Sequence, residues 1–277
     1  MSNAWQLLQD AGIVCWKRRS KAAVAMLTDI LFFLAYGFFS APLYLKIYEY
    51  SEVLFGELAV SSPGLLTSYA AGESFGVLLR QNPALQAIFW KLIALYVLTF
   101  LVLYAVYCLF QGFAWRMAFA VLEEIPLQQF LKQFFFANIL WMLFYILYHF
   151  LSLLVLYQST VAERYASEQP IFLQGSLLVY AFLLSYFAFL SYCFIGREKG
   201  RILWKHAFAL GWKQGRKLFP YVLVLVLAFL LLNFFFLGLT RAGLQEKVRI
   251  AIGILVVIPA LTWGRVYWKM GVEQNLR

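Results

Sequence analysis

The chain has 277 residues, of which 64% are hydrophobic and only 13% charged, and its mean hydropathy is +0.77. A soluble domain of this length could not hide so much apolar surface, so lipid must be the solvent for most of the chain. The formal net charge of +10 suits anionic lipid headgroups. A nucleic-acid partner is not expected, because membrane topology already explains the basic charge.

Six apolar runs are long enough to cross a bilayer, which takes about 20 apolar residues in a helix. The runs are continuous, without the alternation of apolar and polar positions that marks membrane β-barrels. We therefore predict an all-α, polytopic membrane bundle that forms a single transmembrane domain over residues 1–277. The predicted spans cover approximately residues 22–45, 86–110, 134–157, 171–195, 218–239 and 250–268.

Basic residues divide unequally between the two sides of this bundle. Six spans place both termini on one side, and that side carries 16 of the 23 Lys and Arg residues, Arg265 and Lys269 among them. Because positive charge marks the cytoplasmic side, we expect a multi-pass protein of the cell inner (plasma) membrane with both termini cytoplasmic. The N-terminal basic cluster and the basic inner loop 197–217 then offer contacts for anionic lipid, namely Arg18, Arg19, Lys205, Lys213, Arg216 and Lys217.

Three amphipathic stretches precede odd-numbered spans and predict helices that lie in the inner membrane interface. Residues 4–16 place Trp and Leu at helical spacing, and residues 202–219 carry an aromatic face opposite a basic one. The stretch EEIPLQQFLKQFFF, residues 123–136, has Pro126 where a helix would begin. Its two acidic residues, Glu123 and Glu124, are expected to complement the dipole at that helix N-terminus.

The longest predicted loop, residues 46–85, lies on the outer side. It is acidic yet too apolar for a disordered segment, and loops of this length are more often functional than idle. Residues 48–60 could form a helix on the outer surface, ended by the SSPG turn at 61–64, and Pro42 could kink the first span before it. Two roles for the loop stay open: it caps its own bundle, or it docks a partner.

The boundaries of the spans suggest an internal repeat. YCLFQG at 107–112 resembles YCFIG at 192–196, and Lys132 followed by Phe134 resembles Lys217 followed by Phe219. We predict a threefold repeat of lead-in helix, span, outer loop and span.

Asp29 is the clearest functional suspect, because charged residues inside spans are costly and often functional. It lies about 10 Å in from the inner surface at 1.5 Å per residue. Two readings stay open for it: a hydrogen bond to Thr28, a Tyr or a neighbouring helix that holds the bundle together, or a protonatable or substrate-binding role.

Three further polar residues complete the candidate intramembrane site. His149 lies deeper along its span than Asp29, by roughly 12 Å, so the two cannot form a direct acid and base pair. We expect a neutral His149 that shares a hydrogen bond with Tyr145 or another Tyr. Lys91 should extend outward from the start of its span, and Asn138 should join helices across the bundle.

Catalysis by this chain alone is not expected. The sequence has no GxxxxGK[ST], HExxH or GxSxG motif, and its two His residues fall on opposite sides of the predicted bundle. Cys15, Cys108 and Cys193 are scattered and odd in number, which predicts neither disulfides nor a metal site. We therefore predict no catalytic residue, no cofactor and no metal ligand.

WKQGRKLFPYVLVLVL at 212–227, with the related membrane-entering segments at Lys132 and Lys21, resembles six-span prokaryotic membrane families. One of these is the membrane domain fused to some glycerophosphodiester phosphodiesterases. The hydrolytic domain of those fusions has no counterpart in these 277 residues, so the resemblance implies a membrane domain without a transferred activity.

HAFALGWKQGRKLFP at 206–220 resembles the coupling loop of the six-span permease subunit of ATP-driven importers. Ala207, Ala209, Gly211 and Pro220 match that pattern, but the acidic residue that begins it is missing and the Gly-to-Pro spacing is short. Two functions follow as hypotheses. The first is a non-enzymatic subunit or scaffold of a larger membrane assembly, with other membrane subunits as partners. The alternative is a transporter or permease subunit for a small solute, with Asp29 in the path.

Overall fold

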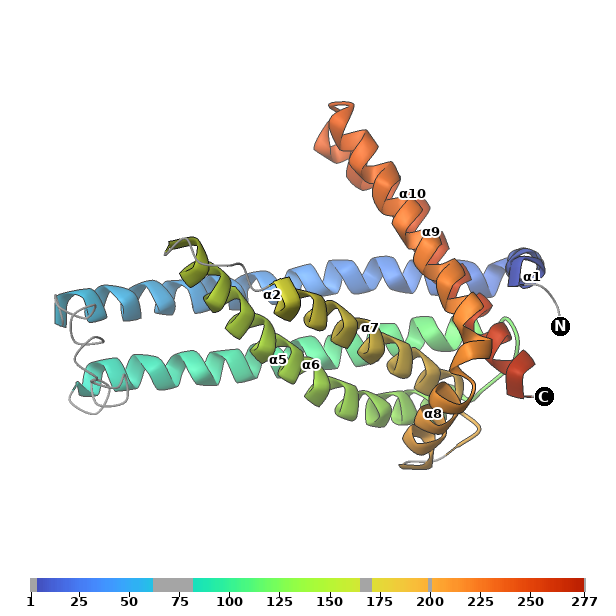
Figure 1. The fold of residues 1–277 in the computed structure, drawn as a ribbon, viewed down its shortest axis with the longest axis horizontal. Coiled ribbons are helices and arrows are strands. Elements are labelled where there is room, and N and C mark those ends of the chain that lie inside the picture. Colours follow the sequence, from blue (N-terminus) through green and yellow to red (C-terminus); the bar gives the residue numbers. More distant parts are fainter. Residues whose placement is uncertain (1–3, 62–81, 165–170, 199–200, 277) are drawn as a thin grey trace. The chain divides into compact units, whose positions relative to one another are not determined.

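The computed structural model describes residues 4–61, 82–164, 171–198 and 201–276 (Figure 1). All regular secondary structure in these ranges is helical, which confirms the all-α prediction. The helices are α1 (Ala4–Lys17), α2 (Arg19–Ser61), α5 (Pro83–Phe119), α6 (Leu127–Arg164), α7 (Ile171–Cys193), α8 (Arg201–Lys213), α9 (Gly215–Arg241) and α10 (Glu246–Leu276).

Six of these helices, α2, α5, α6, α7, α9 and α10, are long and apolar enough to cross a bilayer. Each contains one of the six predicted apolar runs or most of it, so the number and order of the helices are as predicted. Their lengths are not. The helix α2 has 43 residues and continues through Pro42, α5 has 37, and α6 has 38.

The predicted surface helix at 48–60 is the end of α2 and not a separate element. Lys46 and Glu49, one turn apart, form an ion pair of 2.6 Å along this part of the helix, so polar residues here support the helix. A helix of 43 residues is about 65 Å long, roughly twice the thickness of a hydrocarbon core. Residues 62–81 of the predicted outer loop, with most of the SSPG turn, lie outside the described residues.

Two of the three predicted lead-in helices are separate elements, α1 and α8. The predicted lead-in helix at 123–136 is not separate: from Leu127 onward it is part of α6, and Glu123 and Glu124 precede the first turn of α6. The bond from the Phe130 N–H to the Pro126 carbonyl at 3.0 Å shows that the helix starts directly after Pro126. The threefold repeat is not tested by these bounds and stays a prediction.

The chain divides into two compact units, residues 31–107 and residues 1–30 with 108–277. In the smaller unit, the two helices α2 and α5 pack through a small apolar cluster made of Ile47, Leu54, Leu85 and Leu92. Further buried residues are few there, so in this unit most apolar side chains of the two helices face outward, as in Phe38 and Trp90.

The larger unit is built from helical hairpins. Helix α6 packs on α7, and α9 lies along α10 (Figure 1). The amphipathic α1 packs on α10: Leu7 and Ala11 are buried, and the indole of Trp263 donates to the Leu8 carbonyl at 3.2 Å. On the opposite side of α1, Trp5 and Trp16 are exposed, as expected for a helix that meets lipid.

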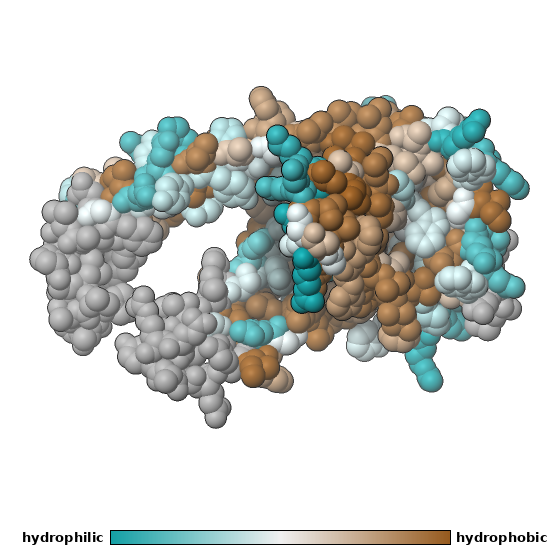
Figure 2. Space-filling view, turned by 90° about the horizontal axis from the view of Figure 1, so that it is seen from above, coloured by the Kyte–Doolittle hydropathy of each residue, from teal (hydrophilic) through white to brown (hydrophobic). Residues whose placement is uncertain are grey.

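Large apolar side chains cover the outward faces of α9 and α10. Leu231, Phe234 and Leu255 are 69%, 66% and 74% exposed, and broad hydrophobic areas are visible on the face shown in Figure 2. Scattered apolar side chains on a soluble surface are ordinary, but continuous areas of this kind require an apolar environment. The hairpin therefore matches the predicted lipid solvent.

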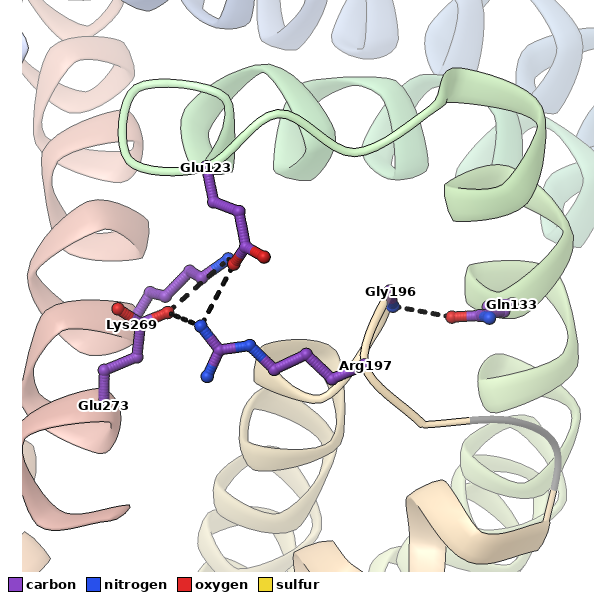
Figure 3. A network of polar contacts seen from close by, with 6 residues as sticks. All are labelled: Glu123, Gln133, Gly196, Arg197, Lys269 and Glu273. Atoms are coloured by element: carbon purple, nitrogen blue, oxygen red, sulfur yellow. Dashed lines mark hydrogen bonds and ion pairs between the residues drawn. The ribbon is translucent and has the colours of Figure 1, made fainter. Parts of the chain in front are cut away.

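One turn at the end of α7 requires glycine. Gly196 has φ +93°, and a Cβ added there would lie 2.8 Å from Cδ1 of Ile125. The Gly196 N–H donates to Oε1 of Gln133 at 2.7 Å (Figure 3). The backbone of this turn therefore lies directly against the segment that joins α5 to α6.

Gly196→Ala should destabilise the protein by more than Gly243→Ala. Both positions have positive φ, which costs an L residue roughly 1–2 kcal/mol, but a Cβ at Gly243 meets no atom within 4 Å. Thermal unfolding in detergent measures the difference. In a double-mutant cycle, Ile125→Ala should cost less in the Gly196→Ala background; equal effects of the two glycine variants would contradict the close contact.

Candidate functional site

Asp29 on α2 is fully buried and closed by a bidentate ion pair with Arg265 on α10. Nη1 of Arg265 lies 2.6 Å from Oδ2, and Nη2 lies 2.8 Å from Oδ1. Gln111 on α5 completes the triad, because its Nε2 donates to Asp29 Oδ1 at 3.1 Å and its Oε1 accepts from Arg265 Nη2 at 2.7 Å. All three side chains are at least 92% buried. Three helices are thus joined by one closed network.

Trp115 connects this triad to a second buried polar pair. The guanidinium of Arg265 lies 5.3 Å from the centre of the Trp115 ring, within the range of a cation–π contact. The Trp115 ring also meets the Tyr192 ring with centroids 5.0 Å apart, and the Tyr192 hydroxyl donates to Oδ1 of Asn138 at 2.6 Å. Two of the four predicted intramembrane residues, Asp29 and Asn138, therefore belong to one chain of contacts.

Asn138 joins helices as predicted. Besides accepting from Tyr192 on α7, its amide donates to the Phe134 carbonyl at 2.8 Å. One turn further along α6, the indole of Trp141 donates to the hydroxyl of Ser191 at 2.9 Å. These two bonds fix α6 against α7 through buried groups, whose hydrogen bonds are costly to break where no water replaces them.

His149 and Lys91 do not take part in this chain of contacts. His149 is exposed on α6, and its ring meets Tyr145 edge-on with centroids 4.4 Å apart. The partner is the predicted Tyr145, which meets His149 through this ring contact. Lys91 is exposed in the smaller unit.

Three buried polar atoms on α10 lack a hydrogen-bond partner within the described ranges. They are Oγ1 of Thr262, the hydroxyl of Tyr267 and Nε1 of Trp268. All three residues lie within three positions of Arg265 and are at least 97% buried. Buried polar atoms of this kind often bind an ordered water.

A second ionic network lies where α5, α7 and α10 end (Figure 3). Arg197 bonds Glu123 at 3.0 Å and Glu273 at 2.7 Å, and Lys269 lies 3.4 Å from Glu123 and 3.8 Å from Glu273. The ammonium of Lys269 also lies 4.4 Å from the centre of the Phe119 ring. Lys269 is fully buried, whereas its carboxylate partners are partly exposed.

Lys21 at the start of α2 reaches the same region. It forms an ion pair with Glu124 and donates to the Ala120 carbonyl at 3.1 Å, while Arg18 donates to that carbonyl at 3.4 Å. The start of α2 and the ends of α5, α7 and α10 therefore meet at one end of the larger unit. Glu123 and Glu124 form ion pairs with these cations. The sequence predicted only that they would complement the dipole at a helix N-terminus.

The charge on Glu123 is stabilised in the folded state. Burial by itself raises the pKa of this carboxyl, but the charges of Lys269 and Arg197 and the bond from Arg197 outweigh burial, so the pKa lies below its usual range. The bond and charge of Lys21 lower the pKa of Glu124 in the same way. Both carboxylates are therefore ionised at neutral pH.

The six predicted lipid contacts, Arg18, Arg19, Lys205, Lys213, Arg216 and Lys217, are all exposed. Sequence reasoning assigned Arg265 and Lys269 to the same basic surface, but both are buried partners of carboxylates. It also missed Gln111. A lone Asp in a span needs a counter-charge, and Arg265 and Lys269, spaced four residues apart on one helix, were the available signal.

Within the described ranges, no three His, Cys, Asp or Glu side chains come together as a metal site would need. The three cysteines are free. Comparisons with protein-family models, with curated proteins and with solved structures found no match to this chain. The two family resemblances of the sequence therefore stay predictions.

Asp29→Ala should lower the free energy of unfolding by about 3–5 kcal/mol, because it leaves Arg265 buried without its counter-charge. Thermal unfolding in detergent measures the loss. Replacing both residues, as Asp29→Leu with Arg265→Met, should recover most of it. Lys46→Gln, which breaks an exposed ion pair on the same helix, is the matched control and should change stability by less than about 1 kcal/mol. An Asp29→Ala protein as stable as the wild type would contradict a structural role for the pair.

Glu123→Gln should destabilise the protein at pH 7 and not at low pH. A carboxyl with a lowered folded pKa contributes stability above its unfolded pKa of 4.5 and loses that contribution as the pH falls through the folded value. The loss at pH 7 should be about 1 kcal/mol, because Glu123 is partly exposed. Unfolding midpoints from pH 7 to pH 3 test this, with Glu246→Gln, an exposed acid without an ion pair in the described ranges, as control. A pH-independent difference would rule out the ionic network as its cause.

Proposed function

We propose that this protein is a non-enzymatic integral membrane protein that acts as a subunit or scaffold of a larger membrane assembly. The observation that carries the proposal is that Asp29 is fully buried with its carboxylate bonded to other side chains of the protein. Both of its carboxylate oxygens are taken by Arg265 and Gln111 inside the protein. A residue that binds a solute or carries protons along a path needs an atom that the solute or a water can reach.

The length of α2 and α5 supports the second half of the proposal. At about 65 and 55 Å they exceed a hydrocarbon core of about 30 Å by enough to continue well beyond it. The part of this pair that holds the cluster of Ile47, Leu54, Leu85 and Leu92 also exposes Tyr48 at 62% and Trp90 at 58%. Tyr and Trp are the residues that most often anchor protein interfaces. A partner subunit on this helical pair would cover them.

The ionic network supports the proposed topology. The start of α2 and the ends of α5, α7 and α10 meet in the larger unit, as expected if the spans run up and down with both termini on one side. The exposed Arg18, Arg19, Lys205, Lys213, Arg216 and Lys217 would place that end on the anionic cytoplasmic face of the cell inner (plasma) membrane.

One observation favours the alternative of transport. Thr262, Tyr267 and Trp268, whose buried polar atoms find no hydrogen-bond partner among the described residues, lie on the same helix as Arg265. A file of waters or a small solute bonded to these atoms would bring a polar path close to the triad. The ion pair would then have to open during each cycle, at the cost of an unpaired buried charge.

The mass of the protein purified in mild detergent decides between these functions. We expect a particle of defined stoichiometry above the 32.0 kDa of one chain, after subtraction of detergent, by light scattering and by native mass spectrometry. A photoreactive amino acid at Tyr48 should give a discrete protein adduct, whereas one at Leu231 on α9, which is as exposed, should react with lipid. A stable monomer, or solute flux in liposomes that is lost in Asp29→Asn, would overturn the scaffold proposal.

A further inference from the structure

A groove of about 840 Å³ opens along the first turns of α6. Its walls come from α6 and from Leu203 on α8, and the residues that line it are Gln128, Gln129, Lys132, Gln133, Phe135, Phe136 and Leu203. The volume is in the range of sites that bind small amphiphilic ligands. The residues of the ion pair, the ionic network and the predicted lipid contacts do not line this groove. Gln133 lines it and also accepts from the Gly196 N–H, next to Arg197 of the ionic network.

The lining separates polar from apolar groups along the helix. The first two turns of α6 supply three glutamines and Lys132, whereas the following turn supplies Phe135 and Phe136. This order matches the change from headgroup to acyl chain that a helix meets as it enters a bilayer. A ligand with one polar end and one apolar end would fit the two parts in register.

The charge of the lining residues favours an amphiphilic ligand with an anionic polar end. Lys132 is the single ionised side chain among the seven lining residues, and no carboxylate of the described part of the chain lines the groove. The amide groups of the glutamines can donate to phosphate oxygens. An anionic phosphate therefore finds a cation and donors here, while the additional cation of a zwitterionic headgroup finds no counter-charge.

The walls of the groove are fixed from behind. Oε1 of Gln133 accepts from the Gly196 N–H at 2.7 Å (Figure 3), and the ring of Phe136 stacks on Trp204 with centroids 4.8 Å apart. The indole of Trp204 in turn donates to the Ala137 carbonyl at 3.3 Å. A pre-formed site loses less entropy on binding than a mobile surface.

We propose that this groove binds one phospholipid with an anionic headgroup, the phosphate bonded by Lys132 and the glutamine amides and an acyl chain lying on Phe135 and Phe136. The inference rests on the proposed placement of this end of the bundle at the inner leaflet. It adds a single selective site to the diffuse contacts of the exposed basic residues, because Lys132 lines one groove together with Phe135 and Phe136.

Lipid titration of the purified protein, followed by native mass spectrometry, tests the site. Phosphatidylglycerol and phosphatidylcholine with identical chains are compared. We expect the first lipid to bind about tenfold more tightly, and Lys132→Gln to remove about that factor, as for one lost hydrogen bond to a charged group. Lys132 is exposed, so this variant should fold. Phe135→Ala should weaken binding of both lipids.

Lys213→Gln is the matched control, since Lys213 is exposed on the neighbouring α8 but does not line the groove. It should leave the affinity for phosphatidylglycerol within about twofold. Equal losses in the Lys132 and Lys213 variants would mean a diffuse basic surface, and unchanged binding in Lys132→Gln would mean that the groove is not the site; either result overturns the inference. The mass of the assembly is read from the same spectra, so a failed scaffold proposal and a failed lipid site are told apart.

Discussion

The ion pair between Asp29 and Arg265 is the interaction on which the arrangement of the larger unit depends. A carboxylate in an apolar helix is costly wherever it lies alone, so the first span can be buried only where a cation meets it. The planar guanidinium satisfies both oxygens of Asp29 and leaves a donor for Gln111, which an ammonium group could not do in the same geometry. Apolar contacts are not directional, so by themselves they fix the relative position of two helices less sharply than hydrogen bonds do. The hydrogen bonds of this network fit one relative position of α2, α5 and α10. Trp115 contacts both Arg265 and Tyr192, and so connects the network to the Tyr192 and Asn138 pair between α6 and α7.

Composition and apolar runs were enough to predict six helices in their correct order, because the energetic requirement of a lipid solvent acts on every residue of a span. The ends of the helices were not predictable in this way. Lys46 and Glu49 read as the start of a loop when hydropathy alone is considered, but they pair along α2 and extend it. The second amphipathic stretch likewise merges with α6, because no residue after Leu127 interrupts the helix. Hydropathy indicates which part of a helix can lie in lipid. It does not indicate where the helix ends, because polar side-chain pairs such as Lys46 and Glu49 extend the helix beyond its apolar part.

The site was predicted in part. Asp29 and Asn138 stand out in a sequence because an isolated polar residue in an apolar run is rare. Arg265 and Lys269 stand out only when a counter-charge for Asp29 is sought, since basic residues near the inner end of a span are common and usually exposed. Their burial follows from Asp29 on α2, from Glu123 in the segment between α5 and α6, and from Glu273 one turn away on α10. Distances between segments so far apart are not encoded in any one stretch. The other polar residues that line the groove are glutamines, and their spacing in the sequence carries no signal by itself.

The partners in the central ion pair are separated by 236 residues along the chain. A ribosome adds about 5–20 residues each second, so Asp29 emerges roughly 10–50 s before Arg265 exists. Throughout that interval the first span, α2, carries an acidic group with no cation from α10 to neutralise it. The nascent protein must therefore keep this part of α2 near water or give Asp29 a temporary partner. Completion of α10 is thus the event that lets α2 be buried.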